Sequence, residues 1–280
     1  MDHHLVPLDP DHPGFRDPVY RARRDAIARI ARDHRHGDPV PDAPYAAEEH
    51  GVWRQIRATL DPLHERLVSA DLLRLARTLD LPTDGIPQLA LVNERLQAHG
   101  FSMEPVAGLV DARIFLMHLG RSTFLSTQYI RHASKPFYTP EPDVVHELVG
   151  HAASLMHPGV AATSRRFGRC AAEATDEEVE RLTRVYWYTL EFGLVEEDGQ
   201  LKALGAGLLS SVGELQRSVE DPTVPRQSLD LDEVVERPYD PTTFQPLYDV
   251  GPGLDGTLAM LDAWLDAGGW RLPSAGIRRR

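Results

Sequence analysis

Cysteine, long apolar stretches and clustered positive charge are all scarce in this sequence, and each scarcity excludes a class of protein. Cys170 is the only cysteine among the 280 residues, so the chain forms no internal disulfide and no thiolate metal cage, which is typical of the reducing cytoplasm. No stretch of about 18 apolar residues occurs, and the amino terminus has no basic segment followed by an apolar run. We therefore expect a cytoplasmic protein that is neither secreted nor inserted in a membrane.

The charge balance is acidic, with a formal net charge of -12. Such a surface repels phosphate backbones and anionic lipid head groups, and the only notable basic cluster is Arg278, Arg279 and Arg280. We therefore expect no nucleic-acid partner and no membrane partner. Hydrophobic residues make up 42% of the chain and charged residues 26%, which is typical of a folded globular protein. Any metal must be held by histidine and carboxylate side chains.

Apolar residues recur at helical spacing through most of the first hundred residues. Trp53, Ile56 and Leu60 belong to one such apolar stripe. Pro62 interrupts that stripe and predicts a helix boundary nearby, whereas Gly100 occupies the position after a helix end that glycine favours. The predicted helices of this part are residues 19–34, 46–67, 70–79 and 86–99.

The pattern changes after residue 100. Residues 113–117 and 123–130 are short apolar runs with weak strand character, so we expect short strands and loops up to residue 140. Thr175 and Glu178 form a capping box that opens a helix running to about Phe192. Further helices are expected at residues 207–219 and 254–265. With no internal repeat or long linker, the sequence predicts a mostly α fold with a few short strands, in one domain over residues 1–280.

Two histidines stand five positions apart in the segment that begins at His146 and ends at His151. The motif of zinc proteases places its histidines four apart, whereas five positions on an ideal α-helix of ~3.6 residues per turn put them roughly 140° apart. Convergence on one ion then requires an irregular first turn, which Pro140 and Pro142 just upstream would permit. The spacing alone leaves open that both histidines make ordinary hydrogen bonds.

Glu191 lies within an aromatic run, residues 185–192. Burial of an unpaired carboxylate there would cost several kcal/mol, so Glu191 needs a cation. A lysine or arginine would serve. Two neutral imidazoles and one carboxylate also form the facial triad that leaves open coordination positions on non-haem iron(II), and this interpretation accounts for His146, His151 and Glu191 together.

Several longer motifs resemble one known family. They are residues 126–132, 134–136 and 138–143, together with 11–24, 186–194, 205–215 and 244–248. In this order, over about residues 11–250, they resemble the pterin-dependent aromatic amino acid hydroxylases. The resemblance implies that family's mostly helical catalytic-domain fold. It also leads us to expect neither the family's regulatory domain nor its tetramerisation helix, and a monomer or small homo-oligomer.

The resemblance assigns a role to each matching residue in the cofactor sites. His146, His151 and Glu191 match the family's iron ligands, and Glu147 matches a carboxylate that hydrogen-bonds the pterin. The other matching positions line the pterin site, where a flat ring would stack on the phenylalanine; they are Gly108, Val110, Phe115 and Tyr186. Leu125, Ala112 and the pair Met117 and His118 depart from the pattern of animal members, which leaves the exact pterin open.

The resemblance also implies a substrate pocket. Arg131 matches the arginine that clamps the α-carboxylate of the substrate, a task suited to a planar and permanently charged fork. A salt bridge to Asp143 is the structural alternative for Arg131, and the two roles are compatible. The remaining pocket positions are Thr139, Trp187, Phe192, Gly207 and Ser210, of which Trp187 lies one helical turn before Glu191.

The implied chemistry is a monooxygenation in which iron(II) and a tetrahydropterin, tetrahydrobiopterin or a relative, activate O2 and hydroxylate the ring of an aromatic amino acid. Trp187 favours L-phenylalanine as this small-molecule substrate, although Pro241 matches neither the phenylalanine nor the tyrosine enzymes. Tryptophan hydroxylation and a different ring position on phenylalanine remain alternatives. A zinc hydrolase with Glu147 as its base and a non-catalytic pterin-binding protein are more distant ones.

Overall fold

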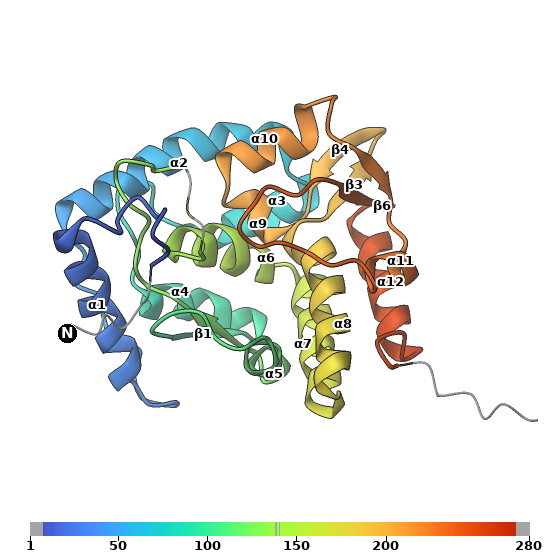
Figure 1. The fold of residues 1–280 in the computed structure, drawn as a ribbon, viewed down its shortest axis with the longest axis horizontal. Coiled ribbons are helices and arrows are strands. Elements are labelled where there is room, and N and C mark those ends of the chain that lie inside the picture. The colour runs from blue at the N-terminus through green and yellow to red at the C-terminus, as the bar shows by residue number, and fades with distance from the viewer. Residues whose placement is uncertain (1–7, 138, 140, 273–280) are drawn as a thin grey trace, which may run out of the picture.

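The computed structural model describes residues 8–137, 139 and 141–272. Tyr138, Pro140 and the arginines at 278–280, which the sequence interpretation used, lie outside these residues. Helices dominate the described part of the chain (Figure 1). The α-helices are α1 (Pro18–Asp33), α2 (Ala47–Leu67), α3 (Ala70–Ala76), α4 (Leu89–Leu96), α5 (Ala112–Gly120), α6 (Ala153–Leu155), α7 (Pro158–Glu173), α8 (Asp176–Tyr186), α9 (Ala206–Leu209), α10 (Val212–Glu220), α11 (Leu231–Val234) and α12 (Leu254–Asp266).

Short helices of other types and two small sheets complete the fold. Two 3-10 turns, η1 (Arg77–Leu79) and η2 (Gln97–His99), extend α3 and α4, and two π-helices are η3 (His146–Ala152) and η4 (Trp187–Glu191). The strands are β1 (Ser102–Pro105), β2 (Thr123–Ser126), β3 (Leu194–Glu197), β4 (Gln200–Ala203), β5 (Arg226–Ser228) and β6 (Tyr248–Gly251). The prediction of a mostly α fold with a few short strands is confirmed.

Both sheets are formed by short pairings. β1 and β2 run parallel, with Ser102 opposite Thr123. The larger sheet has the order β4-β3-β6-β5, in which β3 and β4 form an antiparallel hairpin and the pairs β3–β6 and β5–β6 are parallel. The hairpin turns at Asp198 and Gly199, both with positive φ of 51° and 72°, the conformation that matches the twist of two hairpin strands.

Local signals determine several helix ends as expected. The Thr175 side chain accepts a hydrogen bond from the Glu178 backbone, and the Glu178 side chain accepts one from the Thr175 backbone, so the predicted capping box opens α8. Gly100 has a φ of 73° after η2, the left-handed conformation that glycine adopts without steric cost. The helix predicted to run to about Phe192 does so, but its last turn is the π-helix η4.

One prediction of local structure is wrong. Residues 113–117, expected as a strand, lie in α5, where Asp111 caps the helix and Leu116 and Leu119 are buried three positions apart. A short apolar run does not distinguish a strand from a buried helix turn.

The helix predicted at 46–67 is confirmed as α2, which passes Pro62 and ends at Leu67. Burial of leucines on both sides of Pro62 holds this helix together despite the lost backbone hydrogen bond.

Three predicted boundaries also differ. The strand expected at 123–130 ends with β2 at Ser126, and the helix expected at 86–99 begins at Leu89. The helix expected at 207–219 is two helices, α9 and α10, because Ser211 adopts an extended conformation and its side chain accepts a hydrogen bond from the backbone of Glu214. The Ser211 cap is a local signal that the sequence analysis missed, and element boundaries are in general the least predictable part of a local pattern.

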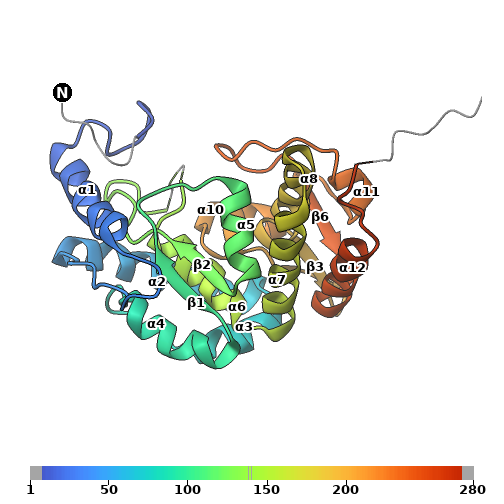
Figure 2. The ribbon, with the colours of Figure 1, turned by 90° about the horizontal axis from the view of Figure 1, so that it is seen from below.

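Helices α5, α7 and α8 pack side by side next to the centre of the molecule (Figure 2). A Cβ atom built on Gly168 of α7 would lie 2.1 Å from the backbone nitrogen of Gly120 in α5. The backbones of the two helices therefore touch where they cross. This contact fixes the position of α5 relative to α7. The Phe115 side chain of α5 then points towards the interior.

Replacement of Gly168 by alanine tests this packing. We expect G168A to lower the free energy of unfolding by about 1–3 kcal/mol or more, because the new methyl group must push two backbones apart. Gly51 in α2 is a matched control, since a Cβ there meets nothing nearer than an arginine side chain at 3.7 Å. G51A should instead raise the free energy of unfolding by about 0.5–1 kcal/mol. Urea unfolding of both variants measures the two signs, and a neutral G168A would contradict the contact.

Candidate metal centre

The two histidines of the 146–151 segment face the same way because this segment is a π-helix. In a π-helix each hydrogen bond spans five residues, so side chains five positions apart lie above one another. The Nε2 atoms of His146 and His151 are accordingly 3.0 Å apart. The sequence analysis predicted that His146 lies at an irregular first turn. The helix begins at Val144, and the wide π-helical turns begin at His146, within its first turn, and run to Ala152. The predicted irregularity is therefore present, in the form of a π-helix.

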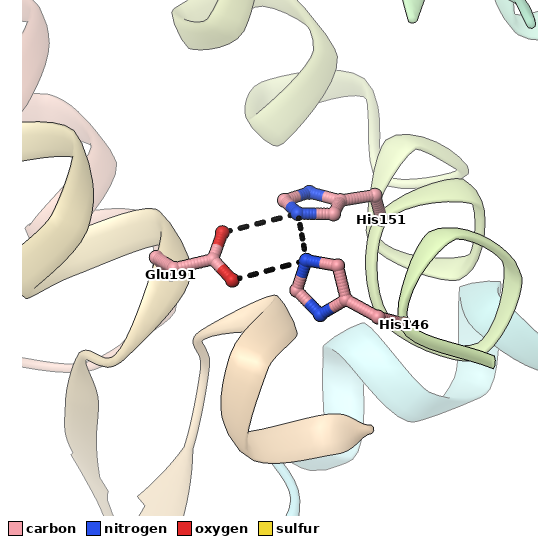
Figure 3. A group of neighbouring side chains, drawn as sticks. All are labelled: His146, His151 and Glu191. Atoms are coloured by element: carbon pink, nitrogen blue, oxygen red, sulfur yellow. Dashed lines mark hydrogen bonds and ion pairs between the residues drawn. The ribbon is translucent and has the colours of Figure 1, made fainter. Parts of the chain in front are cut away.

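Glu191 reaches the same point from a second π-helix. The backbone N–H of Phe192 donates to the carbonyl of Trp187 at 2.8 Å, which closes the wide turn η4 at Glu191. The Glu191 carboxylate then lies 3.3 Å from Nε2 of His146 and 3.0 Å from Nε2 of His151 (Figure 3). Within the described part of the chain these histidines are its ion-pair partners, and no lysine or arginine meets it.

The donor set of these three side chains fits a divalent iron centre. One ligand atom of each residue lies within 4.8 Å of the other two. Two atoms that bind one octahedral ion at about 2.1 Å and at right angles are about 3.0 Å apart. The two Nε2 atoms, 3.0 Å apart, agree with two adjacent corners of such an octahedron, and one carboxylate oxygen faces each nitrogen: Oε1 lies 3.3 Å from His146 and Oε2 lies 3.0 Å from His151. Two imidazoles and a carboxylate without thiolate are the ligands of non-haem iron(II) centres.

Ser210 holds the His146 ring in the form that a metal needs. The Ser210 hydroxyl donates to the carbonyl oxygen of Gly207 at 3.1 Å. Its oxygen therefore accepts the hydrogen of His146 Nδ1, 3.0 Å away. The proton of a neutral imidazole is then on Nδ1, and the lone pair of Nε2 points to the centre. Burial also lowers the pKa of His146 to about 4, so the ring is neutral at pH 7.

Charge is distributed unevenly over the other groups of the centre. Burial opposes the charge of His151, but the Glu191 carboxylate outweighs it and raises the pKa of His151. Burial likewise opposes the charge of Glu191, and the two histidines lower its pKa. Burial raises the pKa of Glu147 to about 7, although the side chain and backbone of Thr127 donate to its carboxylate at 2.9 and 3.1 Å.

A cavity of about 260 Å³ opens on one side of the three residues. All five residues that the resemblance assigned to a pterin site line it: Gly108, Val110, Phe115, Glu147 and Tyr186. The Phe115 ring is held edge-on by Phe124 at 5.4 Å and by Tyr186 at 5.9 Å between ring centroids. The structure thus brings the five expected residues together in one cavity, with Phe115 and Tyr186 as its aromatic lining and Glu147 as a buried carboxylate.

A second cavity, of about 320 Å³, opens on the other side. It is lined by all the residues that the resemblance placed in the substrate pocket: Arg131, Thr139, Trp187, Phe192, Gly207 and Ser210. His146, Glu191 and Trp187 line both cavities. The two cavities therefore meet at His146, Glu191 and Trp187.

Arg131 is paired with Asp143, as the structural alternative proposed. Its Nε and Nη2 atoms donate to the two carboxylate oxygens at 2.8 and 2.7 Å, with side-chain exposures of 3% and 0%. Burial opposes the charge of Asp143, but the guanidinium lowers the pKa of this carboxyl group. The third nitrogen, Nη1, lies 3.4 Å from the carbonyl oxygen of Ser210 at the cavity wall. The pairing orients the fork and leaves Nη1 on the cavity side.

Sequence reasoning missed several residues around the second cavity. Tyr239 stacks on Trp187 with ring centroids 4.4 Å apart, and the Gln245 side chain accepts the indole N–H at 3.0 Å. Glu214 also lines the cavity. Glu214 and Gln245 lie inside motifs that resemble the family, 205–215 and 244–248, so the signal was present. Tyr239 lies outside every motif, and only the folded chain places it.

Loss of the Ser210 hydroxyl tests the orientation of His146. We expect S210A to weaken binding of Fe(II) about 10–100-fold, because the Nδ1 proton of His146 loses its partner and the ring is free to reorient. Ser154 is a matched control, since its buried hydroxyl donates to the Gly150 carbonyl at 2.8 Å without touching either histidine. Anaerobic titration should give unchanged affinity for S154A. Equal affinity in S210A would contradict the assignment of the Nδ1 proton.

Comparisons with known proteins agree with this geometry. Residues 3–267 match the family model described as biopterin-dependent aromatic amino acid hydroxylase. Tyrosine 3-monooxygenase of Rattus norvegicus is 46% identical over 259 residues, covering 89% of this chain and 52% of that protein. Phenylalanine-4-hydroxylase of Rattus norvegicus is 45% identical over 249 residues, covering 87% and 54%. The chain spans about half the length of these curated relatives.

Solved structures show the same fold. Phenylalanine hydroxylase of Chromobacterium violaceum with bound Fe(III) superposes with a TM-score of 0.77 at 28% identity, covering 85% of this chain and 90% of that one. The apo phenylalanine hydroxylase of Colwellia psychrerythraea gives 0.73 at 28% identity, covering 80% and 90%.

No helix in the described residues is long and apolar enough to cross a membrane. The expected resemblance is confirmed by the match over most of the chain, and the expected catalytic-domain fold is confirmed by the superpositions. This chain belongs to the family of biopterin-dependent aromatic amino acid hydroxylases.

Proposed function

We propose that this protein is an iron(II)- and tetrahydropterin-dependent monooxygenase that hydroxylates the ring of an aromatic amino acid, with L-phenylalanine as substrate and tyrosine as product. The observation that carries the proposal is that two cavities meet at His146 and Glu191. A reaction that joins a cofactor, O2 and a substrate at one metal needs such an arrangement, because each reactant must reach the ion without displacing another.

The cofactors of the proposed reaction are Fe(II) and a tetrahydropterin, with O2 as co-substrate. His146, His151 and Glu191 would hold the iron, which together with the pterin supplies the activation of O2. Glu147 would hydrogen-bond the pterin, and the ring would pack on Phe115 in the 260 Å³ cavity. A structure of the Chromobacterium violaceum relative has bound Fe(III) and 7,8-dihydrobiopterin, which supports this assignment.

The substrate would occupy the 320 Å³ cavity. Arg131 would bind the α-carboxylate through Nη1, because Asp143 already holds the other side of its guanidinium. Thr139 and Ser210 line the same cavity, and Trp187 and Phe192, with ring centroids 4.6 Å apart and ring planes inclined by 44°, offer apolar contacts to the aromatic ring. This chain's residues thus orient the ring towards the metal and exclude water from the path between them.

The choice of L-phenylalanine is supported by the aromatic wall and by the solved structures. Trp187 is braced by Tyr239 and Gln245, so the cavity keeps a wide aromatic wall. The solved structures that superpose on this chain include the phenylalanine hydroxylases of Chromobacterium violaceum and Colwellia psychrerythraea. Hydroxylation of L-tryptophan, and of another ring position on phenylalanine, are the alternatives that product analysis separates.

Removal of the carboxylate ligand tests the metal assignment. E191A should lose bound iron by more than about 100-fold in affinity, since even an outer partner of a metal ligand is worth about 10–100-fold. Tetrahydropterin-dependent hydroxylation should be lost with the iron. E177A, which removes an exposed glutamate of the preceding helix α8, is the matched control and should keep both. Iron content is measured by elemental analysis after anaerobic loading, and an E191A variant with full iron and normal turnover would refute the proposal.

Turnover of three amino acids tests the substrate. With Fe(II) and tetrahydrobiopterin, kcat/KM should be highest for L-phenylalanine, and L-tyrosine should be the product, because the cavity wall built on Trp187 suits a single unsubstituted ring. L-tyrosine and L-tryptophan are assayed in parallel, with products identified by chromatography and mass. A preference for L-tryptophan, or a product hydroxylated away from the 4 position, would replace the proposed reaction with one of the alternatives.

A further inference from the structure

The second cavity contains a buried carboxylate that forms no salt bridge within the described chain. Three glutamates line this cavity: Glu141, Glu191 and Glu214. Glu141 is paired with Arg24 and with His12, and Glu191 is paired with the two histidines of the metal centre. Glu214, only 5% exposed, forms no salt bridge within the described residues. Burial of a carboxylate without an ion-pair partner costs free energy, so the presence of Glu214 in this cavity requires an explanation.

The two oxygens of Glu214 differ in their surroundings. Oε1 accepts hydrogen bonds from the backbone N–H of Gln245 at 2.9 Å and from the Tyr248 hydroxyl at 3.1 Å. Among the described residues no donor meets Oε2, and this atom is not one of the fully covered polar atoms without a partner. Because Glu214 lines the cavity, Oε2 is open to it. One oxygen fixes the side chain and the other is left for a ligand.

Charges in the cavity wall favour a cationic group next to Oε2. The positive charge of Arg131 is balanced by Asp143. Burial raises the pKa of Glu214 to about 7, although its two hydrogen bonds and the charge of Arg217 oppose this rise. Arg131 and Glu214 line the same cavity, so an anion-binding guanidinium and a carboxylate oxygen without a donor face one ligand space. A zwitterion with an aromatic ring matches this wall and its aromatic neighbours.

We infer that Oε2 of Glu214 accepts a hydrogen bond from the α-ammonium group of the amino acid substrate. The inference rests on the proposed function, since it assigns a binding partner to a further group of the same substrate. Gln245 connects this contact to the ring: its backbone donates to Glu214, and its side chain accepts the indole N–H of Trp187 at 3.0 Å. The ammonium site and the aromatic wall are therefore held at a fixed spacing by one residue.

The test compares two ligands that differ in the ammonium group alone. The iron-loaded protein is titrated anaerobically with L-phenylalanine and with 3-phenylpropanoate in a calorimeter. The wild-type protein should bind 3-phenylpropanoate about 10–100-fold more weakly, the range expected for a lost hydrogen bond to a charged group. E214Q should bind L-phenylalanine about 10–100-fold more weakly than wild type and 3-phenylpropanoate equally well, because the glutamine oxygen still accepts from Gln245 and Tyr248.

E220Q is the matched control, since it makes the same substitution on α10 at a partly exposed glutamate paired with Arg66. It should bind both ligands as wild type does. An E214Q variant that binds L-phenylalanine as wild type does, or that loses affinity for both ligands equally, overturns the inference while leaving the proposed function standing. A wild-type protein that binds both ligands alike also overturns it. Failure of wild type to bind any aromatic amino acid removes the proposed function itself.

Discussion

The buried carboxylate of Glu191, placed between two imidazole nitrogens, is the interaction on which the rest of the structure depends. To reach that point both ligand segments must be π-helical, and their backbones must lie close to α9. Glycine permits this approach: a Cβ on Gly150 would lie 2.5 Å from the Ala206 carbonyl oxygen, and one on Gly205 would lie 2.2 Å from that of Glu191. The close contact places Ser210 beside His146. A wider turn that would be strained elsewhere is held by packing on three sides.

Several residues that line the two cavities lie next to His146 or Glu191 in the sequence. Trp187 lines both cavities and Tyr186 lines the 260 Å³ cavity, at the start of the turn that ends at Glu191, and Glu147 directly follows His146. Charged side chains in both walls are paired or hydrogen-bonded inside the protein, as Arg131 is to Asp143 and Glu147 to Thr127. Such pairing fixes their orientation before any ligand arrives, so less ordering is required on binding.

Local patterns predicted those parts of the fold that local forces decide. The capping box of Thr175 and Glu178 opened α8 where expected, because both hydrogen bonds lie within one turn. The run at 113–117 was misread because its burial comes from α7 and α8, which only the folded chain provides. The helix predicted at 46–67 forms across Pro62, because burial of the surrounding leucines outweighs the low helix propensity of proline.

For the site, the sequence by itself determined which residues to expect. His146, His151 and Glu191 were predicted from their spacing, from the cost of a buried carboxylate and from the family resemblance, and the structure brings them together. Only the tertiary structure decided the form of the irregular first turn, a π-helix packed against α9, because that form depends on contacts distant in sequence. It also decided which charges remain free. The ion pairs Arg131–Asp143 and Glu191–His146 join residues that local sequence patterns do not connect. Only the folded chain therefore shows that Glu214, among the described residues, has no such ion-pair partner.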